Sequence, residues 1–374
     1  MQTPTVTVVY MSGRNTGGVD YPDAPLIEAL STFVHVLWID SATGEGEPSG
    51  PDLQRIRHNL TRVRTSAPAA EQSIASALDR LGADAAAVIL SDPMARFPRA
   101  LTGHRLFYMT EDWVLGAKKY GLSRRAVRRG IEINCARADT IAAVSHTLAA
   151  RLHLYSKVID AVRVVPPGCS PVDNLDKHGA YDEHGGDSVA LVGPLDERLD
   201  FDILDAVADS GRHILAEGSR TIRTPQATTA RLDAFLARPN VRLVDAAAAE
   251  SPIAAASVGI VPYVLDALDL ARFPSQTLEY LAFGIPVVAT DIPAVRWVDS
   301  EHVTIASSPA EFARRVTEIG SAVQTSAHRV ERRSIASKHT WAARAETMLR
   351  LAGLSRCARA AQSTVPATEA EHRR

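Results

Sequence analysis

Three polar residues close together in the chain, Ser275, Gln276 and Glu279, have the types and the spacing to bind a diphosphate and a ribose. If the first two begin a helix, their backbone amides lack helical partners, and together with the helix dipole they attract a diphosphate. Glu279 lies about one turn further along, where a carboxylate can accept hydrogen bonds from two vicinal ribose hydroxyls. From these residues alone, a surface helix with a solvated Glu279 is an equally good alternative.

The flanking residues predict the loop, helix and strand that would hold these three residues in place. Pro274 is typical of the first turn of a helix, whereas Gly284 and Pro286 are typical of its end. The apolar run that follows, 286–289, predicts a buried strand. The helix would therefore begin near the edge of a sheet, where ligands of α/β proteins bind.

Two series of short apolar runs alternate with alanine-rich segments typical of helices, which predicts buried parallel strands of doubly wound sheets. The first series comprises Val6–Tyr10, Val34–Ile39, Ala86–Leu90, Leu106–Met109, Thr140–Val144 and Val162–Val165. The second comprises Val189–Val192, His213–Ala216, Val241–Val244, Val258–Val261, Pro286–Ala289 and His302–Ile305. We therefore expect an α/β fold of two Rossmann-like domains that face each other across a cleft.

The break between the two series predicts the domain boundaries. A polar stretch rich in Gly, Asp and His, residues 173–187, separates them and is typical of a loop or linker. We expect an N-terminal domain at 1–170, a C-terminal domain at 171–339 and a helix crossing back to the first domain at 340–354. The remaining residues, 355–374, are mostly polar or alanine and predict a disordered tail.

The segment around Glu279 resembles the donor-binding motif of the family 4 glycosyltransferases, which have the GT-B fold. In that family a loop leads to a helix similar to Leu-Glu-Tyr-Leu-Ala and then to Gly-x-Pro-Val-Val-Ala-Thr, as in residues 278–290 here. Five other segments resemble family segments in the family's order, namely 138–145, 162–168, 191–193, 256–263 and 341–345. The resemblance covers residues 105–351 well and the first hundred residues loosely.

The resemblance implies a glycosyltransferase that moves a sugar from a nucleotide-diphosphate sugar to an acceptor hydroxyl with retention of configuration. It implies that the C-terminal domain holds the nucleotide sugar and that the N-terminal domain, with the final helix, holds a small-molecule, glycan or lipid-linked acceptor. It makes Glu279 the ribose ligand, and it makes Ser275, Gln276 and Thr277 the loop whose amides meet the diphosphate.

One cation is expected beside the phosphates. Arg198 follows the first strand of the second domain, and a guanidinium binds phosphate bidentately. A surface ion pair with Asp200 or Glu197 is the alternative. Pro194 stands where the family commonly has a first basic residue, so one cation of the usual pair is missing.

A second departure concerns the transferred sugar. Many family members carry an acidic residue eight positions before the ribose Glu, and here that position is Ala271. Asp266 and Asp269 lie nearby and could replace it only if the loop were shifted. Ala271 and Pro194 motivate an alternative function, a catalytically degenerate GT-B partner or nucleotide-binding subunit. A nucleotide-sugar 2-epimerase is a further alternative, although it needs more acid–base carboxylates than the sequence offers.

Residues that follow the N-terminal strands would face the acceptor. Gly17 and Gly18 would let the backbone approach a donor phosphate or the acceptor, with an ordinary βα turn as the alternative. Asp92 follows one strand, and Glu111 and Asp112 follow the next. We expect Asp92 and Asp112 to orient or deprotonate an acceptor hydroxyl, with a helix-cap or loop role as the alternative.

The composition and the motifs limit which classes of partner and cofactor we expect. The chain has 374 residues, is 46% hydrophobic and has a net charge of −2, which gives no general attraction to nucleic acid. No Asp-x-Asp motif follows a strand convincingly, so we expect a metal-independent enzyme whose only small molecules are its substrates. We see no signal peptide or membrane-spanning run, and expect a cytoplasmic protein. A basic helix face could still contact an anionic membrane, with a solvated face as the alternative; it comprises Arg124, Arg125, Arg128 and Arg129.

Overall fold

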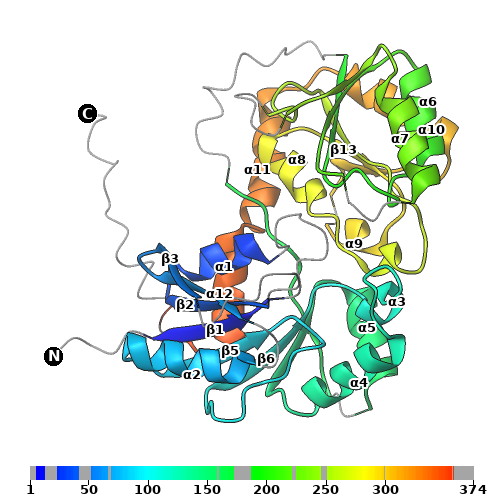
Figure 1. Cartoon of the computed structure of the whole chain (residues 1–374). Helices are drawn as coiled ribbons and strands as arrows, with labels where there is room; N and C mark the ends of the chain where they lie inside the picture. Colours follow the sequence, from blue (N-terminus) through cyan, green and yellow to red (C-terminus); the bar gives the residue numbers. More distant parts are fainter. Residues whose placement is uncertain are drawn as a thin grey trace, which may run out of the picture.

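The computed structural model describes residues 6–12, 23–41, 52–65, 69–157, 160–171, 187–220, 225–245, 251–298, 300–355 and 357. Within these residues the chain forms two α/β units, which lie one above the other in Figure 1. Each unit is built on one largely parallel sheet with helices packed against it.

The first unit contains a sheet with the strand order β3-β4-β2-β1-β5-β6-β7-β8, in which neighbouring strands are parallel except for the antiparallel pair β3 and β4. Its strands are β1 (Thr7–Met11), β2 (His35–Ser41), β3 (Asp52–Arg57), β4 (Leu60–Thr65), β5 (Ala85–Leu90), β6 (His104–Met109), β7 (Thr140–Ala143) and β8 (Arg163–Val164). Its helices are α1 (Ala24–Leu30), α2 (Ala70–Leu81), α3 (Trp113–Gly116), α4 (Arg124–Cys135) and α5 (His146–Tyr155). All five residues of β1 are buried, as expected for a central parallel strand.

The second unit contains an all-parallel sheet with the order β11-β10-β9-β12-β13-β14, the doubly wound order that reverses between β9 and β12. Its strands are β9 (Ser188–Val192), β10 (His213–Glu217), β11 (Val241–Leu243), β12 (Val258–Val261), β13 (Val287–Ala289) and β14 (Val303–Ile305). Its helices are α6 (Phe201–Asp209), α7 (Gln226–Leu236), the 3-10 turn η3 (Asp269–Ala271), α8 (Gln276–Phe283), α9 (Pro293–Arg296), α10 (Pro309–Gly320) and α11 (Ser326–Ser337).

The last helix, α12 (Trp341–Leu351), returns to the first unit and packs against α1 (Figure 1). Its buried side chains Met348 and Leu349 belong to the first hydrophobic core. The chain therefore crosses between the units twice, and the two crossing segments are hydrogen bonded to each other. The Cys169 amide donates to the His339 carbonyl at 3.0 Å, and the Trp341 amide donates to the Cys169 carbonyl at 3.1 Å.

The α/β class and the two parallel-sheet domains expected from the sequence are confirmed. Both series of expected strands are present, and their bounds differ from the expected ones by at most two residues. The sequence did not predict β3 and β4, because their alternating charged residues resemble a polar loop and they pair at the sheet edge. The boundaries at 170 and 339 stay a prediction, and of the tail 355–374 only residues 355 and 357 are described. No helix in the described part of the chain has the length and apolarity needed to cross a membrane.

A buried tyrosine fixes α8 against its sheet. The Tyr280 hydroxyl accepts a hydrogen bond from the Val192 amide at 2.9 Å and is within donating distance of the carbonyls of Ala190 (3.1 Å) and Ile260 (3.2 Å). Its ring packs on Gly259 of β12, where an added Cβ would lie 2.3 to 2.5 Å from ring atoms. Because Gly259 has no side chain, α8 can approach β12 this closely.

Gly259→Ala should destabilise the protein by about 2–3 kcal/mol, because Tyr280 or the strand must move to admit the methyl group. The midpoint of urea unfolding measures this effect. Gly320→Ala at the end of α10 is the matched control, since its added Cβ comes no closer than 3.2 Å to a neighbour. Equal effects of the two substitutions would contradict the packing argument.

Candidate functional site

The first turn of α8 presents unpaired polar groups. Ser275 is the N-cap, and Gly284 ends the helix at φ 82°, in the left-handed conformation that favours glycine. In the described part of the chain no backbone hydrogen bond uses the amide of Ser275 or Gln276, and the buried Thr277 hydroxyl has no partner. Two amides, a hydroxyl and the positive end of the helix dipole are thus free to bind an anion.

The end of β9 approaches this turn very closely. Gly193 has φ 123°, and a Cβ added there would lie 2.6 Å from Nε2 of Gln276 and 3.3 Å from the Tyr263 hydroxyl. Only glycine fits this backbone conformation and this spacing. The loop after β9 and the start of α8 therefore form one continuous surface at the carboxyl edge of the second sheet.

Glu279 is the most strongly perturbed acid of this surface. Burial, and secondarily the negative charge of Glu217 at the end of β10, raise the pKa of Glu279 to about 7. Burial also raises the pKa of Glu217. Among the described residues the Glu279 side chain forms no hydrogen bond or ion pair, and its backbone amide donates to the Ser275 carbonyl at 3.1 Å. Glu279 is half-buried, so its unpartnered carboxyl group can accept hydrogen bonds from hydroxyl donors.

Arg198 reaches this region but is already paired. Its guanidinium contacts both oxygens of Asp196, with Nε at 2.9 Å from Oδ1 and Nη2 at 3.0 Å from Oδ2. It also lies 6.0 Å from the centre of the Tyr263 ring. The alternative partners expected from the sequence, Asp200 and Glu197, are therefore wrong. Asp200 caps α6, and Glu197 pairs with Lys119 of the first unit at 2.5 Å.

A second arginine joins the two units. Arg272, between η3 and α8, forms ion pairs with Glu111 after β6 and with Asp269 in its own loop, and Tyr120 donates a hydrogen bond to Glu111. Burial alone would raise the pKa of Glu111, but Arg272 and Tyr120 hold it below its usual value. Burial raises the pKa of Asp269 to about 6 despite Arg272. The loop that leads to α8 is thus tied to the first unit through charged groups.

Ala271 is fully buried and belongs to the core of the first unit, and its carbonyl accepts a hydrogen bond from Ser145 at 2.5 Å. Of the two acids considered as replacements for an acid at this position, Asp269 pairs with Arg272 and Asp266 accepts from the Asp269 amide at 2.7 Å. Neither acid is left unpaired here.

The two catalytic candidates of the first unit lie at the carboxyl ends of their strands, and both are buried. Asp92 accepts from the Met94 amide at 2.7 Å. Asp112 caps α3 and also accepts from Arg151 at 3.0 Å and from the Tyr155 hydroxyl at 2.8 Å. These are the contacts expected of the alternative role, in which Asp92 and Asp112 cap a helix or stabilise a loop. Action of Asp92 or Asp112 on an acceptor hydroxyl stays a prediction.

Gly17 and Gly18 lie outside the described residues. The four arginines of α4 are all exposed, and Arg128 and Arg129 form ion pairs with Glu132 at 3.6 and 3.4 Å. Trp113, the nearest tryptophan before them in the chain, is buried and packs on Tyr120 with ring centres 5.0 Å apart. The arginine face therefore has no adjoining aromatic anchor at Trp113.

Sequence reasoning missed Arg272 and Glu217. Arg272 directly follows Ala271, the position at which many family members carry an acid. A cation next to that position was the signal that could have identified Arg272. Glu217 ends an expected strand, so its position at the ligand-binding edge of the sheet could have been inferred.

No protein-family model and no curated protein sequence matches this chain. Solved structures match it over nearly its whole length. A sucrose-phosphate synthase from Thermosynechococcus elongatus has a TM-score of 0.69 at 16% identity and covers 92% of this chain and 98% of its own. An α,α-trehalose-phosphate synthase (UDP-forming) from Burkholderia xenovorans in complex with glucose-6-phosphate has a TM-score of 0.68 at 11% identity and covers 93% of this chain and 100% of its own. A trehalose-6-phosphate protein from E. coli bound with UDP-2-fluoro glucose has a TM-score of 0.65 at 13% identity and covers 92% of this chain and 99% of its own. At these identities the likeness shows the fold, and the chain has the GT-B arrangement of two Rossmann-like domains facing across a cleft.

Proposed function

We propose that this protein is a glycosyltransferase that transfers a sugar from a nucleotide-diphosphate sugar to an acceptor hydroxyl. One observation carries the proposal: the first turn of α8 offers unpaired amides and the Thr277 hydroxyl, and Glu279 follows as a half-buried carboxyl group without a partner. This combination suits a diphosphate joined to a ribose, because the amides bind the anion and the carboxylate accepts from the vicinal hydroxyls.

The fold and the sequence motif support the same reaction. Structures with this fold include one bound with UDP-2-fluoro glucose and one in complex with glucose-6-phosphate. By this likeness we propose a UDP-hexose as the donor class and a sugar phosphate as the acceptor class. The motif around Glu279 supports membership of glycosyltransferase family 4 and, through the family, transfer with retention of configuration.

The proposed catalysis rests on the leaving group. The α8 amides and the Thr277 hydroxyl would stabilise the diphosphate as it departs, and this positioning would supply most of the rate. Arg198 would contribute after exchanging Asp196 for phosphate oxygens, which are its natural bidentate partners. These groups take the place of a divalent cation, so we propose that the transfer is metal-independent. The departing diphosphate can accept the acceptor proton, and Asp92 and Asp112 remain candidates for orienting the acceptor.

Nucleotide binding by calorimetry tests the proposed donor site, using UDP, GDP and dTDP. One of them should bind, and Glu279→Ala should weaken its binding about 10- to 100-fold, because hydrogen bonds to a charged group are lost from a half-buried site. Glu311→Ala, which removes a partly exposed acid at the start of α10, is the matched control and should bind as the wild type does. If no nucleotide binds, or if the two variants behave alike, the donor site is wrong.

A second candidate function is a GT-B partner that binds a nucleotide without transferring a sugar. It is motivated by Ala271, whose side chain packs in the core of the first unit, and by the ion pairs that already engage Arg198 and Arg272. The two candidates differ in turnover. A bound nucleotide with no transfer or hydrolysis across a panel of donors and sugar phosphates would support the partner role.

Peripheral membrane contact through Arg124, Arg125, Arg128 and Arg129 stays a proposal, supported by the exposure of all four side chains. Sedimentation with vesicles containing anionic lipid tests it. Binding that persists after all four are changed to glutamine would contradict it.

A further inference from the structure

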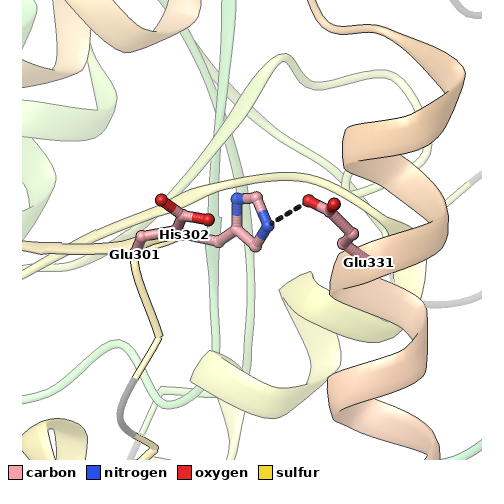
Figure 2. A group of neighbouring side chains, drawn as sticks. All are labelled: Glu301, His302 and Glu331. Atoms are coloured by element: carbon pink, nitrogen blue, oxygen red, sulfur yellow. Dashed lines mark hydrogen bonds and ion pairs between the residues drawn. The ribbon is translucent and has the colours of Figure 1, made fainter.

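A cluster of metal-ligand types lies on the second unit, outside the proposed donor site. Glu301 and His302 precede β14, and Glu331 lies on α11. Each offers one ligand atom, and these atoms all lie within 4.8 Å of one another. Figure 2 shows the imidazole ring between the two carboxyl groups, with His302 Nε2 3.2 Å from Glu331 Oε2.

A fourth group lies on the same helix face. His328 is one turn before Glu331 on α11, and residues three apart on a helix face the same side. Its ring centre is 6.3 Å from that of His302. Two imidazoles that share one tetrahedral ion have ring centres about 5 Å apart, so a shift of about 1 Å brings His328 within reach.

The spacing of the ligand atoms suits a small ion. In a tetrahedral zinc site with bonds of about 2.0–2.1 Å, ligand atoms lie about 3.3 Å apart. The distance of 3.2 Å between His302 and Glu331 already has this value. The side chain of Glu331 is 58% exposed and Glu301 is also exposed, so both can rotate, whereas His302 is only 10% exposed and is held in place.

The donor types select among metals. Imidazole nitrogen together with carboxylate oxygen is typical of zinc and related transition metals, whereas calcium and magnesium favour all-oxygen sites. Two carboxylates also neutralise the charge of a divalent ion. We propose that Glu301, His302 and Glu331 bind a divalent transition metal of the Zn²⁺ type, with His328 as the fourth ligand.

The position of the cluster indicates what a bound ion does. Arg332, next to Glu331, donates from Nη1 to the carbonyl of Gly284 at the end of α8, at 2.9 Å. The cluster therefore lies towards the carboxyl end of α8, and the proposed donor site lies at its amino end. An ion bound there joins the edge strand β14 to α11 and fixes the helix that supports α8, so it is a structural site and takes no part in the proposed transfer.

The test uses the full chain, stripped with a chelator and titrated with Zn²⁺ by calorimetry and with Co²⁺ by visible absorption. The wild type should bind one equivalent, give the strong visible bands of tetrahedral Co²⁺ without a thiolate charge-transfer band, and gain thermal stability with Zn²⁺. Glu331→Gln keeps a hydrogen bond to His302 but loses the anionic ligand, and it should weaken binding about tenfold or more, as should His302→Gln and His328→Gln.

Glu318→Gln on α10 is the matched control, since Glu318 is an exposed helical glutamate that pairs with Arg314, and it should bind Zn²⁺ as the wild type does. Nucleotide binding is measured on the same samples, so a failure of the donor site is seen separately from a failure of the metal site. A wild type that takes up no Zn²⁺ at micromolar concentration would overturn the proposal. So would Glu331→Gln and His302→Gln variants that bind as tightly as the control, because His302 and Glu331 would then form only a hydrogen bond.

Discussion

Replacing Arg272 with methionine should destabilise the protein by about 3 kcal/mol. The substitution leaves Glu111 and Asp269 without their cation, and the side chains of these acids are only 18% and 4% exposed. Removing one member of a largely buried ion pair costs about 3–5 kcal/mol, because the remaining charge stays desolvated. The midpoint and slope of urea unfolding measure the change, and two acids losing one cation make this the largest effect that we expect of a single substitution.

Arg296→Met provides the matched control. Arg296 pairs with Asp291 in the same unit with similar geometry, but its side chain is 59% exposed, so its removal should change the midpoint little. A double variant Arg272→Met with Glu111→Gln should be more stable than the sum of the single effects, because the second change removes one orphaned charge. Equal midpoints for Arg272→Met and Arg296→Met would show that the ion pair between Arg272 and Glu111 contributes nothing to stability.

Nucleotide binding should weaken about 100-fold between pH 8 and pH 5. The pKa of Glu279 is raised from its ordinary 4.5 to about 7, and only the ionised carboxylate accepts from both ribose hydroxyls. Below pH 7 the carboxyl group is protonated, and the ionised fraction falls about tenfold for each further pH unit. Binding near pH 7 should therefore release a proton, which calorimetry detects as a heat that depends on the ionisation enthalpy of the buffer.

The matched variant for this prediction is Glu279→Gln, which shares every other titrating group, including the phosphates of the ligand. Its affinity should vary less with pH, and its binding should release no proton from position 279. The sign for stability is opposite to that for binding. The folded state holds its proton up to about pH 7 whereas the unfolded state loses it near 4.5, so the unliganded wild type should lose stability relative to the variant as pH rises through this range. Parallel pH profiles of affinity for the two proteins would contradict the assignment of Glu279.

The fold and the place of the proposed donor site could be predicted from local sequence patterns. The helix α8 ends at Gly284 as predicted, whereas Pro274 lies just before the N-cap Ser275 and not in the first turn, so the start of the helix is shifted by two residues from the prediction. Buried parallel strands are similarly visible, since runs of apolar residues are their direct requirement. These features depend on interactions within a few residues of the chain.

The ion pairs could not be predicted in the same way. Glu111 and Arg272 are 161 residues apart and meet only because the two units are placed with η3 against the first one. Asp196 rather than Asp200 holds Arg198, because the turn after Gly193 brings the guanidinium back to the nearer acid. Contacts of this kind depend on the assembled fold, and the sequence could only offer candidates for them.

Because the chain crosses between the two units twice, the order of its synthesis on the ribosome affects how each unit folds. The first sheet leaves the ribosome before the second, but α12, which covers α1 with Met348 and Leu349, is made only after the entire second unit. The second unit has its own core and all its strands before that point, so it can complete folding while the first still exposes the apolar surface that α12 will cover. The order in which the two units mature is therefore the reverse of the order in which they begin, and a nascent chain stalled before residue 341 should be held by chaperones that recognise the uncovered face of the first unit.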